Sequence, residues 1–232
     1  METPAGTRAA TRPLRADARQ NRDRIMAAAR EVFIEQGPGA PLEEISRRAG
    51  TGIATLYRRF PDRHALMRAV VKDALERTAQ AARDAAAAEA DPFAALTRYM
   101  HQVLEIRVSA VVPALMSEVS LDDDPDILRA RHDGAEQIES LISAAQAAGT
   151  LRPDVAFGDI GLLLVRLSRP LPGPFSREMN DRLSHRHLDL LINGLRADGQ
   201  AAAPVAGPAL SLGDLHALRR EPPAGTRPGS AG

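Results

Sequence analysis

Apolar residues recur along most of this chain at the spacing of amphipathic helices. Between residues 18 and 36 one apolar stripe falls at i, i+3, i+4, i+7 and i+8, formed by Ile25, Ala28, Ala29, Val32 and Phe33. The same period predicts further helices over about 42–49, 53–60, 63–88, 92–107, 110–119, 125–148, 154–169 and 176–196. No segment carries a convincing strand pattern, so we expect an all-α fold of about nine helices.

Acidic residues mark the starts of several of these helices. Asp62, Asp91 and Asp124 stand where an N-cap is expected, and proline follows Asp91 and Asp124 directly. An aspartate side chain accepts hydrogen bonds from the free N–H groups of the first turn, and proline suits the first helical position. Asp154 is expected to open the eighth helix in the same way.

The two ends of the chain differ from its middle. Residues 1–16 contain Arg, Ala, Thr and Pro without a period, and the tail at 198–232 is rich in Ala, Pro and Gly. We therefore expect a disordered basic arm and a mostly disordered tail. The helices between them fall into a short first group at 17–62 and a larger second group at 63–197.

Composition and charge narrow the classes of function. The 232 residues include no cysteine, which excludes disulfide frameworks, thiol catalysis and cysteine-ligated zinc. The net charge is zero, yet residues 1–72 carry 14 basic and 8 acidic side chains while residues 73–232 carry 16 and 22. A basic head on an acidic body indicates that one end meets a polyanion. Without a membrane-length apolar run or a signal peptide, the protein is expected to be soluble and cytoplasmic.

Two short helices separated by Gly50 lie inside the basic head. Glycine tolerates the positive φ that a tight turn between helices needs, and Ser46 is small enough for a close helix crossing. The residues expected to face inward are Leu42, Ile45, Ala49, Ile53 and Leu56. This is helix-turn-helix spacing, in which the second helix offers polar side chains to the major groove of DNA.

The segments LEEISRRAG at 42–50 and TLYRRFPDRHAL at 55–66 stand at a spacing that characterises one family. With Ile25, Ala28, Ala29, Phe33 and Gly37, they make residues 21–70 resemble the N-terminal DNA-binding domain of the TetR family of transcriptional regulators. The resemblance implies that 17–62 is the DNA-binding domain. It also implies that 63–197 is a helical regulatory and dimerisation domain, entered by a long linking helix.

Individual residues take roles from this resemblance and from their chemistry. The resemblance implies that Tyr57 and Arg63 contact phosphate and that Thr55 lies at the DNA surface. By residue type, Arg58 and Arg59 suit a bidentate contact to guanine, with Arg58 favoured. The predicted DNA-binding residues are Arg47, Arg48, Thr51, Gly52, Ala54, Thr55, Tyr57, Arg58, Arg59 and Arg63.

The first turn of the recognition helix departs from the family pattern at Thr51, Gly52 and Ile53. If Ile53 faces the DNA instead of the core, it and Ala54 offer only apolar contact, for example to a thymine methyl group. The basic arm, with Arg8, Arg12 and Arg15, either contacts the minor groove or backbone or is a solvated tail.

Polar and large side chains of the second group are candidates for an effector pocket. They are Arg98, His101, Arg107, Met116 and Arg166. Arg166 interrupts the apolar run GLLLVRL, so it is either a pocket cation, a partner in a structural ion pair or an exposed edge residue. No cofactor or metal is expected: His185 and His187 point apart on a helix, and Asp189 shares only the face of His185.

The last two helices carry more apolar surface than one helix layer requires. A two-fold four-helix interface would bury this surface, and the alternative is an internal core. The predicted dimer residues are Ile160, Leu163, Leu164, Leu167, Leu183, His187, Leu190 and Leu191.

These observations predict a dimeric DNA-binding transcriptional regulator. We expect a repressor that binds a pseudo-palindromic operator and is released from it by a small-molecule effector. A helical adaptor for protein partners, with a structural basic head, is the alternative. An enzyme is not expected, because no catalytic or nucleotide-binding motif occurs.

Overall fold

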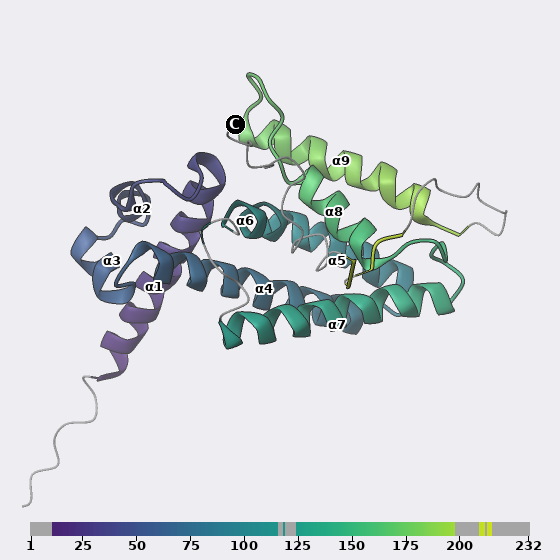
Figure 1. The fold of residues 1–232 in the computed structure, drawn as a ribbon, viewed down its shortest axis with the longest axis horizontal. Helices are drawn as coiled ribbons and strands as arrows, with labels where there is room; N and C mark the ends of the chain where they lie inside the picture. Colours follow the sequence, from purple (N-terminus) through teal and green to yellow (C-terminus); the bar gives the residue numbers. More distant parts are fainter. Residues whose placement is uncertain (1–10, 116–117, 119–123, 198–208, 212, 215–232) are drawn as a thin grey trace, which may run out of the picture. The chain divides into compact units, whose positions relative to one another are not determined.

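The structure is a computed structural model that describes residues 11–115, 118, 124–197, 209–211, 213 and 214 (Figure 1). Within these residues the chain forms nine helices, as predicted. They are α1 (Thr11–Gln36), α2 (Leu42–Arg48), α3 (Ile53–Arg59), α4 (Arg63–Ala88), α5 (Pro92–Ile106), α6 (Val108–Leu115), α7 (Pro125–Ala147), α8 (Phe157–Leu167) and α9 (Arg177–Leu195). None of these helices is both long and apolar enough to cross a bilayer.

The helix starts test the capping predictions. Asp62 accepts a hydrogen bond from the Ala65 N–H at 2.7 Å, and Asp91 and Asp124 accept bonds from the first turns of α5 and α7. These three N-caps are therefore confirmed. At the N-terminus, α1 begins at Thr11, so residues 11–16 are helical where the sequence pattern predicted a disordered arm.

The start of α8 differs from the prediction. Asp154 does not cap this helix, because its carboxylate is bonded to Arg152, with Nε–Oδ1 and Nη2–Oδ2 distances of 2.9 and 2.7 Å. The helix starts instead at Phe157, and the carboxylate of Asp159 accepts a bond from the backbone N–H of Ala156. The competing arginine two residues away explains the later start.

The described helices belong to two compact units. One contains residues 1–75 and 110–129, and the other contains residues 76–109 and 130–232. The boundary therefore lies inside α4, whereas the sequence pattern placed it before this helix. The first half of α4 joins the first unit because Leu66 and Val70 are fully buried there and Asp73 pairs with Arg30 of α1.

The first unit is built on the apolar stripe of α1. Fully buried side chains from α1, α2, α3 and α4 form its core: Ile25, Ala29, Val32, Phe33, Ile45, Leu56, Leu66 and Val70. The predicted inward residues are buried except Ile53, which is only half-buried. Removing this apolar surface from water is the main force that fixes α2 and α3 against α1.

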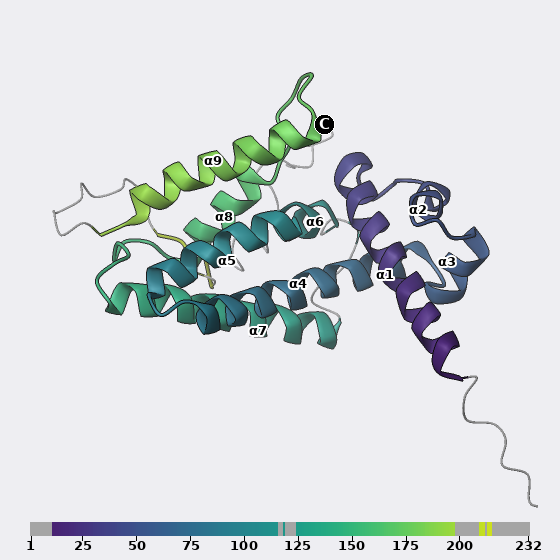
Figure 2. The same cartoon turned by 180° about the vertical axis from the view of Figure 1, so that it is seen from behind.

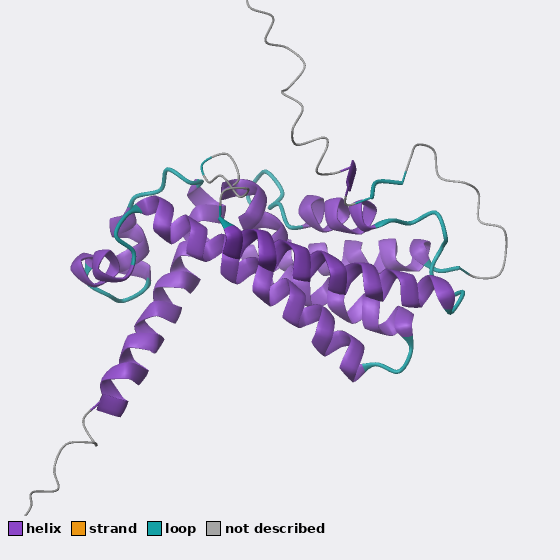
Figure 3. Cartoon of the chain, turned by 60° about the horizontal axis from the view of Figure 1, so that its bottom comes forward, coloured by secondary structure: helices purple, strands orange, loops and turns teal. Residues whose placement is uncertain are grey.

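In the second unit, α5 contacts both α8 and α9, and α8 contacts α9. Helices α4 and α7 run side by side in both views (Figures 1 and 2), and Arg83 pairs with Asp133 between them at 3.0 Å. Helices dominate the described part of the chain (Figure 3), whose only β pairing is an isolated bridge between Leu151 and Arg196.

A short segment of the tail docks on the N-terminal end of α8. The backbone N–H of Gly158 donates to the carbonyl oxygen of Leu210 at 2.7 Å. A Cβ atom at position 158 would lie 2.4 Å from that oxygen and 2.7 Å from the Leu210 Cβ. Only glycine therefore permits this approach. Part of the region predicted to be mostly disordered thus has a defined backbone contact.

Replacing Gly158 tests this contact. We expect Gly158→Ala to displace residues 209–211 and to lower the free energy of unfolding by about 1–3 kcal/mol through overpacking. Hydrogen exchange at the backbone amide of position 158 should accelerate. Gly161→Ala in the same helix is the control, because nothing lies within 4 Å of its added Cβ. Equal effects of the two substitutions would contradict the docking.

Candidate nucleic-acid interface

The turn between α2 and α3 has the geometry that the sequence predicted. Gly50 has a φ of 62°, in the left-handed region that favours glycine. Its N–H donates to the carbonyl of Arg47, and the N–H of Thr51 donates to that of Ser46. Ser46 is 6% exposed, and its hydroxyl donates to the carbonyl of Glu43 at 2.9 Å. Ser46 is therefore a small buried residue of α2 whose hydroxyl has a hydrogen-bond partner.

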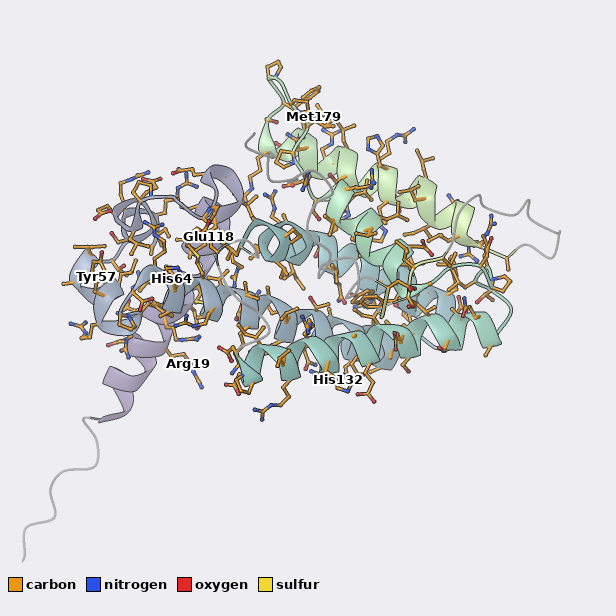
Figure 4. The ribbon with its side chains drawn as sticks, in the orientation of Figure 1. Arg19, Tyr57, His64, Glu118, His132 and Met179 are labelled. Atoms are coloured by element: carbon orange, nitrogen blue, oxygen red, sulfur yellow. The ribbon has the colours of Figure 1, made fainter. Side chains whose placement is uncertain are left out.

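Helix α3 is anchored by one fully buried side chain. Leu56 is buried, Thr55 is half-buried, and Tyr57 is 46% exposed at the outer side of the helix (Figure 4). Arg58 and Arg59 are also exposed. One apolar contact thus holds a helix whose remaining surface offers a hydroxyl, a phenol and two guanidinium groups.

The two arginines of α3 have few internal partners. Arg58 makes only a long contact of 3.4 Å from Nη2 to the hydroxyl of Thr55. Among the described residues, neither Arg58 nor Arg59 forms an ion pair with a carboxylate. Their positive charge is therefore available to an external acceptor.

The two arginines of α2 are held by carboxylates. Arg47 donates from Nε to Oε2 of Glu44 at 2.9 Å and from Nη2 to Oε1 at 2.8 Å. Arg48 donates from Nε to Oε1 of Glu44 and from Nη1 to Oε2 of Glu35, both at 2.7 Å. Hydrogen bonds from Arg47 and then Arg48 lower the pKa of Glu44 to about 2. Glu44 is thus ionised at neutral pH.

Arg63 is directed toward the protein's own backbone. Its Nη1 donates to the carbonyl of Pro38 at 2.9 Å and also to that of Ala40, so the first residue of α4 holds the α1–α2 connection. The resemblance implied a phosphate contact for this residue, and that role remains a prediction. The observed bonds indicate a structural contribution that the sequence pattern did not reveal.

The first turn of α3 offers little polar contact. The N-cap is Gly52, which has no side chain to accept a bond, and Ala54 is exposed. The hydroxyl oxygen of Thr51 is buried and has no hydrogen-bond partner among the described residues. Thr51 therefore does not present its hydroxyl oxygen to solvent in the way that a residue reading DNA would.

The candidate effector residues of the second unit that the structure describes lie in separate surroundings. Arg98 pairs with Glu89 at 3.0 Å, and Arg107 pairs with Asp181. Arg166 is exposed on α8, so the alternative of an exposed edge residue describes it better than a pocket cation. Met116 lies outside the described residues. The structure therefore does not gather these arginines into one site.

His101 takes part in a cluster that the sequence could not predict. Its Nδ1 lies 3.0 Å from Nδ1 of His185, and its Nε2 lies 3.0 Å from Oδ1 of Asp189. The ring centroids are 5.3 Å apart and the ring planes differ by 3°. Since each ring nitrogen lies about 1.2 Å from its centroid, these distances describe edge-to-edge rings whose nitrogens point at each other. The cluster joins α5 to α9.

The predicted dimer residues divide by burial. Ile160 and Leu164 are buried in the core of their own chain, which fits the internal-core alternative. The half-buried members are Leu163, Leu167, Leu183 and Leu191, and the exposed ones are His187 and Leu190.

Two exposed apolar side chains on these helices were missed by the sequence analysis. Leu162 on α8 is 40% exposed. Met179 on α9, labelled in Figure 4, is 42% exposed. Leu162 lies four residues before Arg166, so the two share a helix face. An exposed Arg166 would therefore have indicated an exposed Leu162, but Arg166 was considered a possible pocket cation.

Comparison with known proteins agrees with this geometry. Residues 25–70 match the family model described as bacterial regulatory proteins of the tetR family. Residues 91–197 match the model described as the SbtR-like transcriptional regulator C-terminal domain. No curated protein sequence gives a significant match.

Solved structures extend the comparison over most of the chain. The TetR regulator SCO0520 from Streptomyces coelicolor is 30% identical, with a TM-score of 0.57 over 76% of this chain and 99% of that one. A TetR regulatory protein from Mycobacterium vanbaalenii is 34% identical, with a TM-score of 0.57 over 79% and 99%. The TetR-like regulator LfrR from Mycobacterium smegmatis, solved with proflavine, shares the fold at 23% identity and a TM-score of 0.55 over 74% and 95%.

The backbone bonds of Arg63 lead to a stability prediction. Arg63→Met keeps the aliphatic stem but leaves the Pro38 and Ala40 carbonyls without their donor. We expect the free energy of unfolding, measured with urea, to fall by about 1–3 kcal/mol. Arg68→Met is the matched control, because Arg68 is an exposed arginine on the same helix and forms no hydrogen bond with the residues that the structure describes. If both variants lose the same free energy of unfolding, the bonds of Arg63 to Pro38 and Ala40 do not stabilise the fold.

Proposed function

Because this chain belongs to the TetR family of bacterial transcriptional regulators, which bind DNA and are not enzymes, we propose that it is a ligand-released repressor. A homodimer binds a pseudo-palindromic operator and blocks transcription. A small molecule bound to the second unit lowers the affinity for the operator.

The observation that carries the proposal is the exposed, cationic α3 on its single buried anchor. A helix of this kind fits the major groove, where arginine bonds to two acceptors of guanine at once. Among the described residues Arg58 and Arg59 form no ion pair, so DNA binding breaks no salt bridge and at most the 3.4 Å contact of Arg58 with Thr55. We assign base readout to Arg58 with Thr55, and backbone positioning to Tyr57.

Two half-sites require two copies of α3 at a fixed spacing. The apolar side chains exposed on α8 and α9 support a dimer formed through these helices. Leu190 is 59% exposed and Leu162 is 40% exposed, so a partner surface that covered them would remove apolar area from water. We propose that these residues, with the half-buried leucines of both helices, pack against their copies in a second chain.

Effector release requires that the head respond to a change in the rest of the chain. Arg63 and Asp73 attach the first half of α4 to the head, and the same helix continues into the second unit. A ligand that favours one orientation of α4 thereby favours one spacing of the two heads. The proflavine complex of LfrR supports a small-molecule site in a protein of this fold.

The decisive experiment selects genomic DNA fragments with the full-length protein and measures their binding at increasing salt. A regulator of this class should select a few inverted-repeat sites, and its affinity should fall steeply with salt because counterions are released on binding. Failure to retain any fragment, together with recovery of a stable protein partner, would favour the helical adaptor instead.

Substitution of Arg58 tests the assignment of base readout. We expect Arg58→Ala to weaken binding by about 1–3 kcal/mol and to relax specificity at one base pair, because a bidentate contact is lost. Tyr57→Phe is the contrasting variant and should weaken binding to all sequences alike, since it removes only a phosphate contact. The selected sequence logos of the two variants and the wild type provide the measurement. An unchanged logo for Arg58→Ala would refute its role.

Substitution of Leu190 tests the dimer. We expect Leu190→Asp to yield a monomer in light scattering, because it would bury a carboxylate at the proposed interface. Its affinity for the inverted repeat should fall much more than its affinity for a half-site. Ser140→Asp, which adds the same charge to an exposed position of α7, should remain a dimer. A dimeric Leu190→Asp protein would place the interface elsewhere.

A further inference from the structure

The basic surface of the head contains one acidic residue that holds two arginines. Glu44 accepts two hydrogen bonds from Arg47 and one from Arg48, and its side chain is only 21% exposed. Its neighbour Glu43 is exposed, and no ion pair of its carboxylate is observed among the described residues. Two adjacent glutamates with the same charge therefore have different surroundings.

The bonds to Glu44 resemble the bonds that the same arginines would make to DNA. A carboxylate and a phosphate both accept two parallel N–H bonds from a guanidinium fork. Arg47 already makes this bidentate contact with Glu44 while remaining 72% exposed. Glu44 occupies the Nε–Nη2 edge of Arg47, which leaves only the Nη1–Nη2 edge for a phosphate. A phosphate at that edge shares the cation with an ionised carboxylate, so the net gain from the contact is small.

The ionised carboxylate also acts directly on the DNA. Two arginines and two glutamates, Glu35 and Glu44, meet on this surface, so their local charges cancel. A carboxylate within a Debye length of the phosphates repels them. The basic pair of α2 thus contributes less attraction than its sequence suggests, while Arg58 and Arg59 of α3 keep their full charge.

We propose that Glu44 limits the sequence-independent part of DNA binding by occupying Arg47. This inference rests on the proposed function, because it takes α2 as the helix that meets the DNA backbone. Glu44 sets the strength of binding to every duplex and leaves the choice of sequence to α3. An effector typically changes affinity by about 5- to 150-fold. Because the affinity for DNA is limited, a change of this size is enough to release the protein from its operator.

The test compares Glu44→Gln with Glu43→Gln on a duplex selected by the wild type and on a random-sequence duplex. Glutamine keeps the size of the side chain and removes one negative charge in both variants. Glu44→Gln should bind both duplexes about three- to tenfold more tightly, with the same ratio between them. The slope of log affinity against log salt should become more negative by about 0.9, which is one phosphate contact.

Glu43→Gln should have a clearly smaller effect, because Glu43 holds no arginine. A double-mutant cycle identifies the released group. In an Arg47→Gln background the gain from Glu44→Gln should fall to about the size of the Glu43→Gln effect, because only the direct repulsion is removed and Arg48 stays paired with Glu35. Circular dichroism and thermal unfolding confirm that each variant keeps its helices.

Three results would overturn the inference. Glu44→Gln could weaken binding or leave it unchanged, which would make Glu44 a support that orients Arg47. Glu43→Gln could match Glu44→Gln, which would point to overall charge. The gain could survive at its full size in the Arg47→Gln background. If the wild type binds no duplex at all, the proposed function fails as well. If it binds and Arg58→Ala behaves as expected, only the role of Glu44 fails.

Discussion

The left-handed backbone at Gly50 determines which side chains of α3 face the solvent. Helix α3 is anchored by a single fully buried side chain, Leu56, so apolar burial alone does not fix its orientation. The turn supplies the missing constraint through a φ of 62° and a hydrogen bond to Arg47. A side chain with a Cβ would make this conformation costly by about 1–2 kcal/mol. The exposure of Tyr57 and Arg58 follows from the turn.

Helix α4 is attached to the head by charges rather than by its apolar face alone. Arg63 holds the α1–α2 connection, and Asp73 lies 2.5 Å from Arg30 of α1. Lys72, next to Asp73, pairs with Asp126 at the start of α7. These contacts explain why the compact unit extends to residue 75, well beyond the start of α4. A motion of the first half of α4 must carry the head with it.

Local signals explain how much of the fold could be predicted from the sequence. Helical periods and the caps at Asp62, Asp91 and Asp124 depend on residues a few positions apart, and the structure confirms them. The start of α8 was predicted wrongly because Arg152 competes for Asp154. The sequence shows that Arg152 is close to Asp154, but it does not show that Asp154 binds this arginine instead of capping the helix.

The candidate sites were harder to predict because apolar or basic character does not reveal a partner. Ile160 has the period of an interface residue and belongs to the chain's own core. Arg47 and Arg63 were predicted to bind DNA, yet each is already bonded within the protein. The i, i+3 spacing of Glu44 and Arg47 was a usable signal, whereas the contact of Arg63 with Pro38 spans 25 residues and leaves no local pattern.

The edge-to-edge histidines between α5 and α9 have a strict proton arrangement. With His101 neutral, its Nε2 donates to Asp189, so its Nδ1 is an acceptor and the proton between the rings belongs to His185. His185 and Asp189 stand one turn apart on α9 and hold His101 from both sides. This arrangement selects one tautomer for each ring. The two contacts of His101 with α9 fit one register of the helices, because a slide by one turn would separate His101 from both His185 and Asp189.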